Sequence, residues 1–183
     1  MVHDPALRIA YAPAAYYRPW RTVYAAGSAE QRRWLNTALI RQRWLQLPAS
    51  PVAPQDVLTR RMLGLWDRLP QVATLMAAAQ LRVWLPTQRG SVALPPMVQA
   101  FMRAGHARGE LSALPSCTLD EAPDVLLQWG AAELRPIAPM LPAWLSARLC
   151  LPFAGLSGER PPPVEHPDMD LFWSAVTYVE KLS

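Results

Sequence analysis

Hydrophobic residues recur along this 183-residue chain at intervals of three and four, and prolines separate the patterned segments. The interval matches the 3.6-residue repeat of an α-helix, whereas the apolar–polar alternation typical of strands is nearly absent. Twenty prolines keep each segment short, because proline ends or restarts a helix. The pattern therefore predicts an all-α fold, built as a single compact domain of about six to eight short, proline-punctuated helices.

The first clear helical pattern covers about residues 28–46. Ser28 and Gln31 have capping-box spacing, in which each side chain bonds the backbone N–H of the other residue at a helix start. A stripe at helical spacing follows, made of Leu35, Ala38, Leu39, Gln42 and Leu45. Four arginines lie mostly off the stripe, interleaved with Trp34 and Trp44; they are Arg32, Arg33, Arg41 and Arg43. We expect this helix to be buried along the stripe and basic on its outer side.

Two apolar segments follow and predict a central helix pair. The first, about 55–68, carries a stripe of Leu58, Met62, Leu65, Trp66 and Leu69. The second, about 70–85, is apolar on several sides, as expected of a helix in the middle of a bundle. Further on, Pro95-Pro96 opens a short helix, Thr118 and Glu121 have capping-box spacing before a helix to about Leu134, and a short helix covers 144–149. Asp168 is placed to cap a last helix.

Composition shifts divide the predicted domain into four parts. Residues 1–27 form an aromatic, proline-punctuated arm packed on the body, and their alternation over 7–11 also admits a short N-terminal strand. Residues 28–154 form the helical core. Residues 155–167 are rich in Pro and Gly and read as an exposed tether, with Pro161-Pro162-Pro163 favouring polyproline II. Residues 168–183 form the C-terminal helix.

Charge is sparse and unevenly distributed. Charged residues make up 17% of the chain, against about 25% in typical soluble domains, while 51% of residues are hydrophobic and eight are Trp. Two explanations fit this composition. Either some apolar surface is covered by a partner protein, or the tryptophans form a core and no large apolar surface remains exposed. Residues 1–108 hold 14 Arg against four acids (+10), and residues 109–183 hold four basic residues against ten acids (−6). The excess of Arg over Lys (17 to 1) suggests a GC-rich bacterial genome, which weakens any reading of individual arginines.

Residues with catalytic or metal-binding chemistry are scarce. The three histidines fall at a terminus (His3), in a predicted turn (His106) and in the proline-rich tether (His166), and no serine has nucleophile-elbow glycines around it. No Cys-x-x-Cys, His-x-x-x-His or phosphate-binding glycine pattern occurs. We therefore expect no catalytic residues, no metal and no cofactor.

The sequence also predicts that the protein is cytosolic. Its start lacks a basic segment followed by an apolar one, so no signal peptide is expected. Uncharged stretches reach about 13 residues, short of the roughly 20 that span a bilayer. Cys117 and Cys150 are expected to be reduced and buried. The basic, Trp-bearing front half admits two kinds of partner: nucleic acid, as in an Arg/Trp-rich regulator that contacts phosphates and stacks on bases, or other proteins, since Arg and Trp are enriched at interface hot spots. Other proteins are favoured over nucleic acid, because Lys is nearly absent, no known nucleic-acid-binding motif is visible and the tail is acidic.

Three stretches carry a family resemblance. Residues 7–16 give an apolar entry followed by Pro-x-x-Tyr, residues 62–66 through 81–82 give the central apolar helices, and Trp144-Leu145-Ser146-Ala147-Arg148-Leu149 precedes Leu151-Pro152. Taken in order, they resemble the SctK family, the YscK- and PscK-like cytosolic proteins of bacterial type III secretion systems. The resemblance implies an all-helical adaptor of the sorting platform, without active site or cofactor. Such adaptors join the SctQ pod proteins to the cytoplasmic domain of the inner-membrane ring protein SctD.

The partner-binding residues are predicted on physical grounds. Arg32, Arg33, Arg41 and Arg43, with Trp44, form an expected basic docking face, and Asp168 and Asp170 an acidic one. Opposite charge at two ends would suit a bridge between unlike partners, because complementary potentials steer each partner to its own face. On its own the chain is expected to be a monomer.

Overall fold

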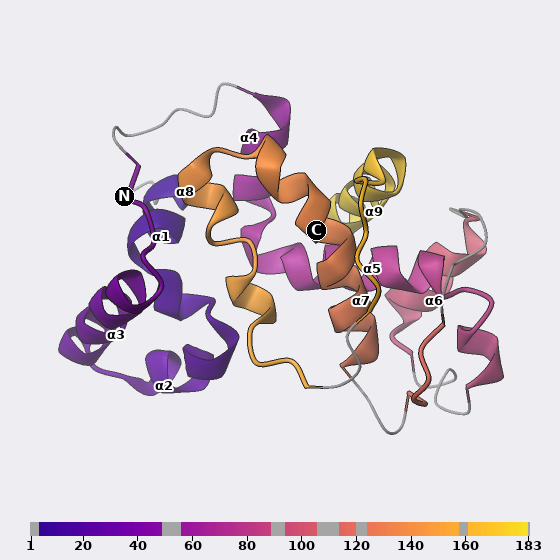
Figure 1. Ribbon diagram of the computed structural model, residues 1–183, viewed down its shortest axis with the longest axis horizontal. Coiled ribbons are helices and arrows are strands. Elements are labelled where there is room, and N and C mark those ends of the chain that lie inside the picture. The colour runs from indigo at the N-terminus through magenta and orange to yellow at the C-terminus, as the bar shows by residue number, and fades with distance from the viewer. Residues whose placement is uncertain are drawn as a thin grey trace. The chain divides into compact units, whose positions relative to one another are not determined.

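The fold is helical throughout the part of the chain that the computed structural model describes, residues 4–48, 56–88, 94–105, 114–119, 124–157 and 161–182. Across these ranges there are nine α-helices and no strand (Figure 1). The helices are α1 (Pro5–Tyr11), α2 (Arg21–Ala26), α3 (Ala29–Gln42), α4 (Val57–Gly64), α5 (Leu69–Gln80), α6 (Pro96–Arg103), α7 (Val125–Leu134), α8 (Ala143–Ser146) and α9 (Met169–Lys181). The all-α prediction is confirmed, and the helices beyond the expected six to eight are α1 and α2 in the N-terminal arm.

The prediction that a short N-terminal strand is possible at residues 7–11 is wrong, because these residues belong to α1. The Asp4 side chain accepts a hydrogen bond from the Ala6 N–H and Pro5 occupies the first turn, two features that favour a helix start. Ala6, Ile9 and Ala10 are the buried residues of α1, and they follow helical spacing. Two apolar–polar repeats are too few to outweigh this cap.

The predicted helix starts are confirmed where they can be compared. Ser28 and Gln31 form both hydrogen bonds of a capping box, and the Asp168 carboxylate accepts from the Leu171 N–H at 2.8 Å. Asp56 caps α4 in the same way, and its bond from the Thr59 N–H holds the pKa of the carboxyl below its usual value. Glu121, the second residue of the other predicted capping box, lies outside the described residues.

The chain divides into two compact units, and each recruits two separate segments. The first unit contains Met1–Leu69 and Ile137–Gly155, and the second contains Pro70–Pro136 and Leu156–Ser183. The boundaries between arm, core, tether and C-terminal helix, placed from composition after residues 27, 154 and 167, stay a prediction.

Arg148 lies at the centre of the first unit and is fully buried. Its guanidinium donates hydrogen bonds to three backbone carbonyls: Ala10 in α1 (2.9 Å), Gln46 after α3 (2.7 Å) and Trp144 in α8 (2.5 Å). Burial lowers the pKa of Arg148, but an arginine starts so high that the group stays charged. The forked guanidinium therefore connects three segments, since one donor group bonds carbonyls from each of them, two of these bonds being buried.

Aromatic contacts support the same region. The Tyr16 hydroxyl donates to the Ile9 carbonyl at 2.7 Å, and the Tyr16 ring meets Trp66 edge-on at 5.4 Å. Burial raises the pKa of Tyr16, so its hydroxyl remains a donor at neutral pH. The turn that follows α1 is thereby fixed to the end of α4.

The second unit is built around α5, which the sequence predicts as apolar on several sides. Val72, Ala73 and Leu75 to Ala79 are buried. Helix α7 crosses α5 at Gly130, where a Cβ would lie 2.0 Å from the Ala73 carbonyl oxygen. Only glycine permits this approach. On the C-terminal side, the Tyr178 ring of α9 packs edge-on against Phe101 of α6 at 5.2 Å.

Gly130→Ala should lower the free energy of unfolding by about 3 kcal/mol or more, because the two backbones must separate to admit the methyl group. Gly64→Ala is the matched control: a Cβ at Gly64, inside α4, meets nothing within 4 Å. That change should raise stability by about 0.5–1 kcal/mol, the difference in helix propensity. Urea unfolding followed by circular dichroism measures both, and equal midpoints would contradict the close crossing.

Arg148→Met keeps the side-chain length but leaves three backbone carbonyls without this donor, two of them in buried hydrogen bonds. We expect a loss of about 3 kcal/mol. Arg41→Met, at an exposed position of α3, provides the control and should shift stability by less than about 0.5 kcal/mol. A urea midpoint for Arg148→Met equal to that of Arg41→Met would show that the carbonyl contacts are not stabilising.

Candidate protein-binding surface

Helix α3 is much less buried than a helix of its length normally is. Only Leu35 and Leu39 of its 14 residues are buried, and α2 beside it has no buried residue. The cause is the sequence, since polar residues occur all round α3. Most helices in proteins depend on burying an apolar face for their stability. This end of the first unit therefore presents an unusually large helical surface.

One side of α3 collects exposed residues at helical spacing. We define the α3 face as Glu30, Arg33, Trp34, Thr37 and Arg41 on the helix, together with Trp44 two residues after its end, all of them exposed. Residues three, four, seven and eleven positions apart share one side of a helix. The face thus combines two indoles, two guanidinium groups and a single carboxylate, Glu30.

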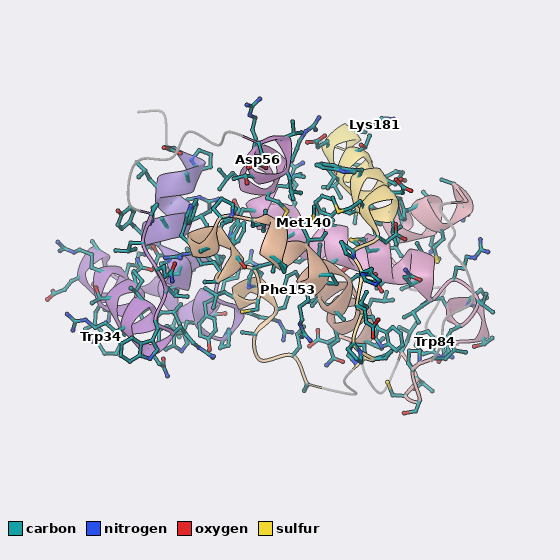
Figure 2. The ribbon with its side chains drawn as sticks, turned by 45° about the horizontal axis from the view of Figure 1, so that its top comes forward. Trp34, Asp56, Trp84, Met140, Phe153 and Lys181 are labelled. Carbon is teal, nitrogen blue, oxygen red and sulfur yellow. The ribbon has the colours of Figure 1, made fainter. Side chains whose placement is uncertain are left out.

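Trp34 and Trp44 are the two most exposed tryptophans, 68% and 90% accessible. Figure 2 shows Trp34 at the margin of the first unit, on α3. Other tryptophans behave differently: Trp66, Trp84, Trp129 and Trp144 are all buried. The Trp-rich composition therefore has two structural explanations at once. Some tryptophans form the core, and Trp34 and Trp44 remain on the surface.

Arg32, a predicted docking residue, is engaged within the molecule. Its Nε donates to the Tyr24 carbonyl at 3.0 Å and its Nη2 to the Ala25 carbonyl at 2.8 Å. The guanidinium also lies 5.6 Å from the centre of the Tyr24 ring. Arg32 therefore caps the C-terminal end of α2, where cations satisfy free carbonyls.

Arg43 is engaged in a similar way. Its Nη2 donates to the Tyr17 hydroxyl at 3.2 Å, and the group lies 5.8 Å from the centre of that ring. The bond to Tyr17 raises the pKa of Arg43. Tyr17 in turn packs edge-on against Trp20. Arg43 joins the end of α3 to the turn before α2.

Arg33 and Arg41 differ from this pair. Both are exposed, and neither guanidinium forms a hydrogen bond or ion pair with the part of the chain that the structure describes. The predicted basic docking face thus separates into two structural arginines and two whose charges point to solvent.

The two residues of the predicted acidic face, Asp168 and Asp170, differ in exposure. Asp168 is 3% exposed and its carboxylate caps α9, so the capping role that the sequence also allowed is the observed one. A buried cap cannot present its charge to a partner. Asp170 is exposed in the first turn of α9, where a carboxylate interacts favourably with the helix dipole.

The other residues considered for chemistry are dispersed. His3 and His106 lie outside the described residues, and His166 is exposed. Within the described ranges, no group of three or more His, Cys, Asp or Glu could hold a metal ion. Cys117 and Cys150 are free thiols, and the expectation that both are buried is wrong, because Cys117 is half-buried and Cys150 is exposed. No helix in the same ranges is long and apolar enough to cross a membrane.

The fold and this surface define an all-helical protein with an exposed Trp–Arg helix face, and comparison with known proteins gives its family. Residues 6–181 match the family described as bacterial type III secretion apparatus protein (OrgA_MxiK). The chain is 30% identical over 184 residues to the oxygen-regulated invasion protein OrgA of Salmonella typhimurium strains 14028s, SL1344 and LT2. The alignment covers 95% of this chain and 86% of each relative. No solved structure matches.

The chain belongs to the OrgA_MxiK family of bacterial type III secretion apparatus proteins. The resemblance to the SctK family drawn from three stretches of sequence is thereby confirmed. The family is one of secretion-apparatus components.

Trp34 is the surface residue that sequence reasoning did not select. Its signal was present, because it lies seven residues before Arg41 on the polar side of a predicted helix. The engagement of Arg32 and Arg43 had no such signal, since Tyr24 and Tyr17 belong to a segment without a clear helical pattern.

Paired substitutions should separate the two classes of arginine. We expect Arg32→Ala with Arg43→Ala to lower Tm by about 2–4 °C, because bonds to the Tyr24, Ala25 and Tyr17 oxygens are lost. Arg33→Ala with Arg41→Ala should leave Tm within about 1 °C. Differential scanning fluorimetry compares the two double variants. A larger loss from the second pair would show that Arg33 and Arg41 are the structural ones.

Proposed function

We propose that this chain is a non-enzymatic, cytosolic adaptor of a type III secretion apparatus. It links SctQ-like pod proteins of the sorting platform to the cytoplasmic domain of an SctD-like inner-membrane ring protein. Family membership supports the setting, because residues 6–181 match a secretion-apparatus family. Similarity to the invasion protein OrgA supports a role in virulence.

The observation that carries the bridging role is the difference in charge between the two compact units. The first unit contains eleven arginines against four acids, a net charge of +7. The second contains seven basic residues against ten acids, a net charge of −3. Two bodies of opposite sign favour two different partners, since complementary charge increases association rates and rejects like-charged surfaces.

A bridging assay tests the proposal directly. The ring-protein domain from the same genome is immobilised, and the pod protein is passed over it with and without this chain. We expect pod protein to be retained only when the chain is present, and each partner to bind the chain separately.

Retention of pod protein without the chain would show that no adaptor is needed. Failure of the chain to bind either protein would rule out the proposal. The Gly64→Ala variant, which changes no exposed charge or aromatic residue, should behave as wild type throughout.

A further inference from the structure

Trp44 adopts a backbone conformation that tryptophan normally avoids. Its φ is +50°, and among the described residues it is the only non-glycine with positive φ. It terminates α3 in a Schellman motif: the Leu45 N–H bonds the Ile40 carbonyl at 3.0 Å and the Trp44 N–H the Arg41 carbonyl at 3.3 Å. Glycine usually occupies this position, because a Cβ in the left-handed region is strained.

Nothing within the described part of the chain compensates for this strain through the side chain. Trp44 is 90% exposed, so its indole buries almost no apolar surface. Termination of α3 requires only the backbone geometry, which returns Leu45 to the core at 6% exposure. Glycine or asparagine would provide that geometry at lower cost. A strained residue with an exposed aromatic side chain is a reason to look for a function.

The strained turn fixes the backbone that carries the indole. The two Schellman bonds hold Trp44 in one backbone conformation directly after α3, and the side chain is exposed there. Trp34 lies on α3 itself, eight residues before its last residue, Gln42. At 1.5 Å per residue, those eight residues of helix span roughly 12 Å. Two exposed indoles attached at this spacing fit a recess about two to three helical turns long.

Charge selects the chemistry of the partner. Arg33 and Arg41 flank the indoles, and Glu30 is the one carboxylate of the α3 face. The whole first unit carries +7. A complementary surface would place an apolar recess at its centre and carboxylates at its rim, the usual arrangement of protein interfaces. The α3 face has too few free cations for strong binding of nucleic acid. Its two solvent-facing guanidinium groups neutralise about two phosphates, whereas about 6–10 phosphate contacts are typical of strong binding.

We propose that the α3 face docks onto an acidic protein surface, inserting Trp34 and Trp44 into an apolar recess while Arg33 and Arg41 meet carboxylates around it. The inference rests on the proposed function, and the occupant is an acidic surface of one of the two apparatus proteins. The strain at Trp44 is retained because it presents the indole to this partner.

Trp44→Gly separates binding from folding. Glycine relieves the left-handed strain and removes an indole that is not buried, so Tm should be unchanged or rise by a few degrees. Affinity for one of the two partners should nevertheless fall at least 30-fold, as expected for an interface hot spot. Trp34→Ala should weaken the same partner, and Arg33→Glu with Arg41→Glu should slow its association most at low salt.

Isothermal titration of the full-length chain against purified pod protein and against the ring domain, each alone, provides the test. Val57→Ala is the control, because Val57 is a 64% exposed apolar residue on α4, away from the α3 face. It should leave both affinities unchanged. Loss of one affinity in Trp44→Gly at wild-type or higher Tm would support the inference.

The other outcomes overturn it, and they distinguish it from the adaptor role. If wild type binds both proteins and Trp44→Gly does too, the α3 face is wrong and the adaptor role stands. If wild type binds neither, the adaptor role fails and the inference with it. Loss of both affinities would contradict a single occupant. Trp44-dependent self-association in sedimentation, or Trp44-dependent binding of a mixed oligonucleotide at physiological salt, would assign the face to a second copy or to nucleic acid.

Discussion

The first unit depends on a buried positive charge that no carboxylate of the described residues neutralises. Arg148 is surrounded instead by carbonyl oxygens from Ala10, Gln46 and Trp144, which lie 138, 102 and 4 residues away in sequence. A guanidinium suits this role because its donors point in several fixed directions within one plane. Each carbonyl belongs to a segment end or turn, where backbone acceptors lack a helical partner. The charge is thus stabilised by dipoles, and the segment ends are satisfied by the charge.

The second unit solves the packing problem in the opposite way. Its central contact, between Gly130 on α7 and Ala73 on α5, contains no polar side chain and depends on the absence of one. Small residues let two helices approach until their backbones touch, and Val72, Leu75 and Met76 of α5 are fully buried. The first unit therefore contains a specific polar connection at its centre, and the second a close apolar contact.

Local features of this structure were predictable and distant ones were not. The helical repeat, the Ser28–Gln31 capping box and the Asp168 cap all arise from residues within a few positions of each other, so a single sequence contains them. The environment of Arg148 and the crossing at Gly130 depend on residues more than 50 positions away, and no periodicity encodes them. The candidate surface on α3 followed the same division. The basic side of α3 was predictable, but which arginines remain available depended on Tyr24 and Tyr17. At residues 7–11 two local signals conflicted. The apolar–polar alternation favoured a strand and the Asp4–Pro5 helix start favoured a helix, and the helix formed.

The division of the chain into two interleaved units has a consequence for its synthesis. The first unit begins near the N-terminus, yet its central arginine is reached 138 residues after Ala10. At translation rates of about 5–20 residues per second, the N-terminal helices wait on the order of ten seconds for that side chain. During this interval the Ala10 and Gln46 carbonyls lack their donor, while all of Pro70–Pro136 is synthesised. The half-made protein therefore passes through a period in which its most exposed helices, α2 and α3, are attached to an incomplete body, and chaperones have the longest access to them.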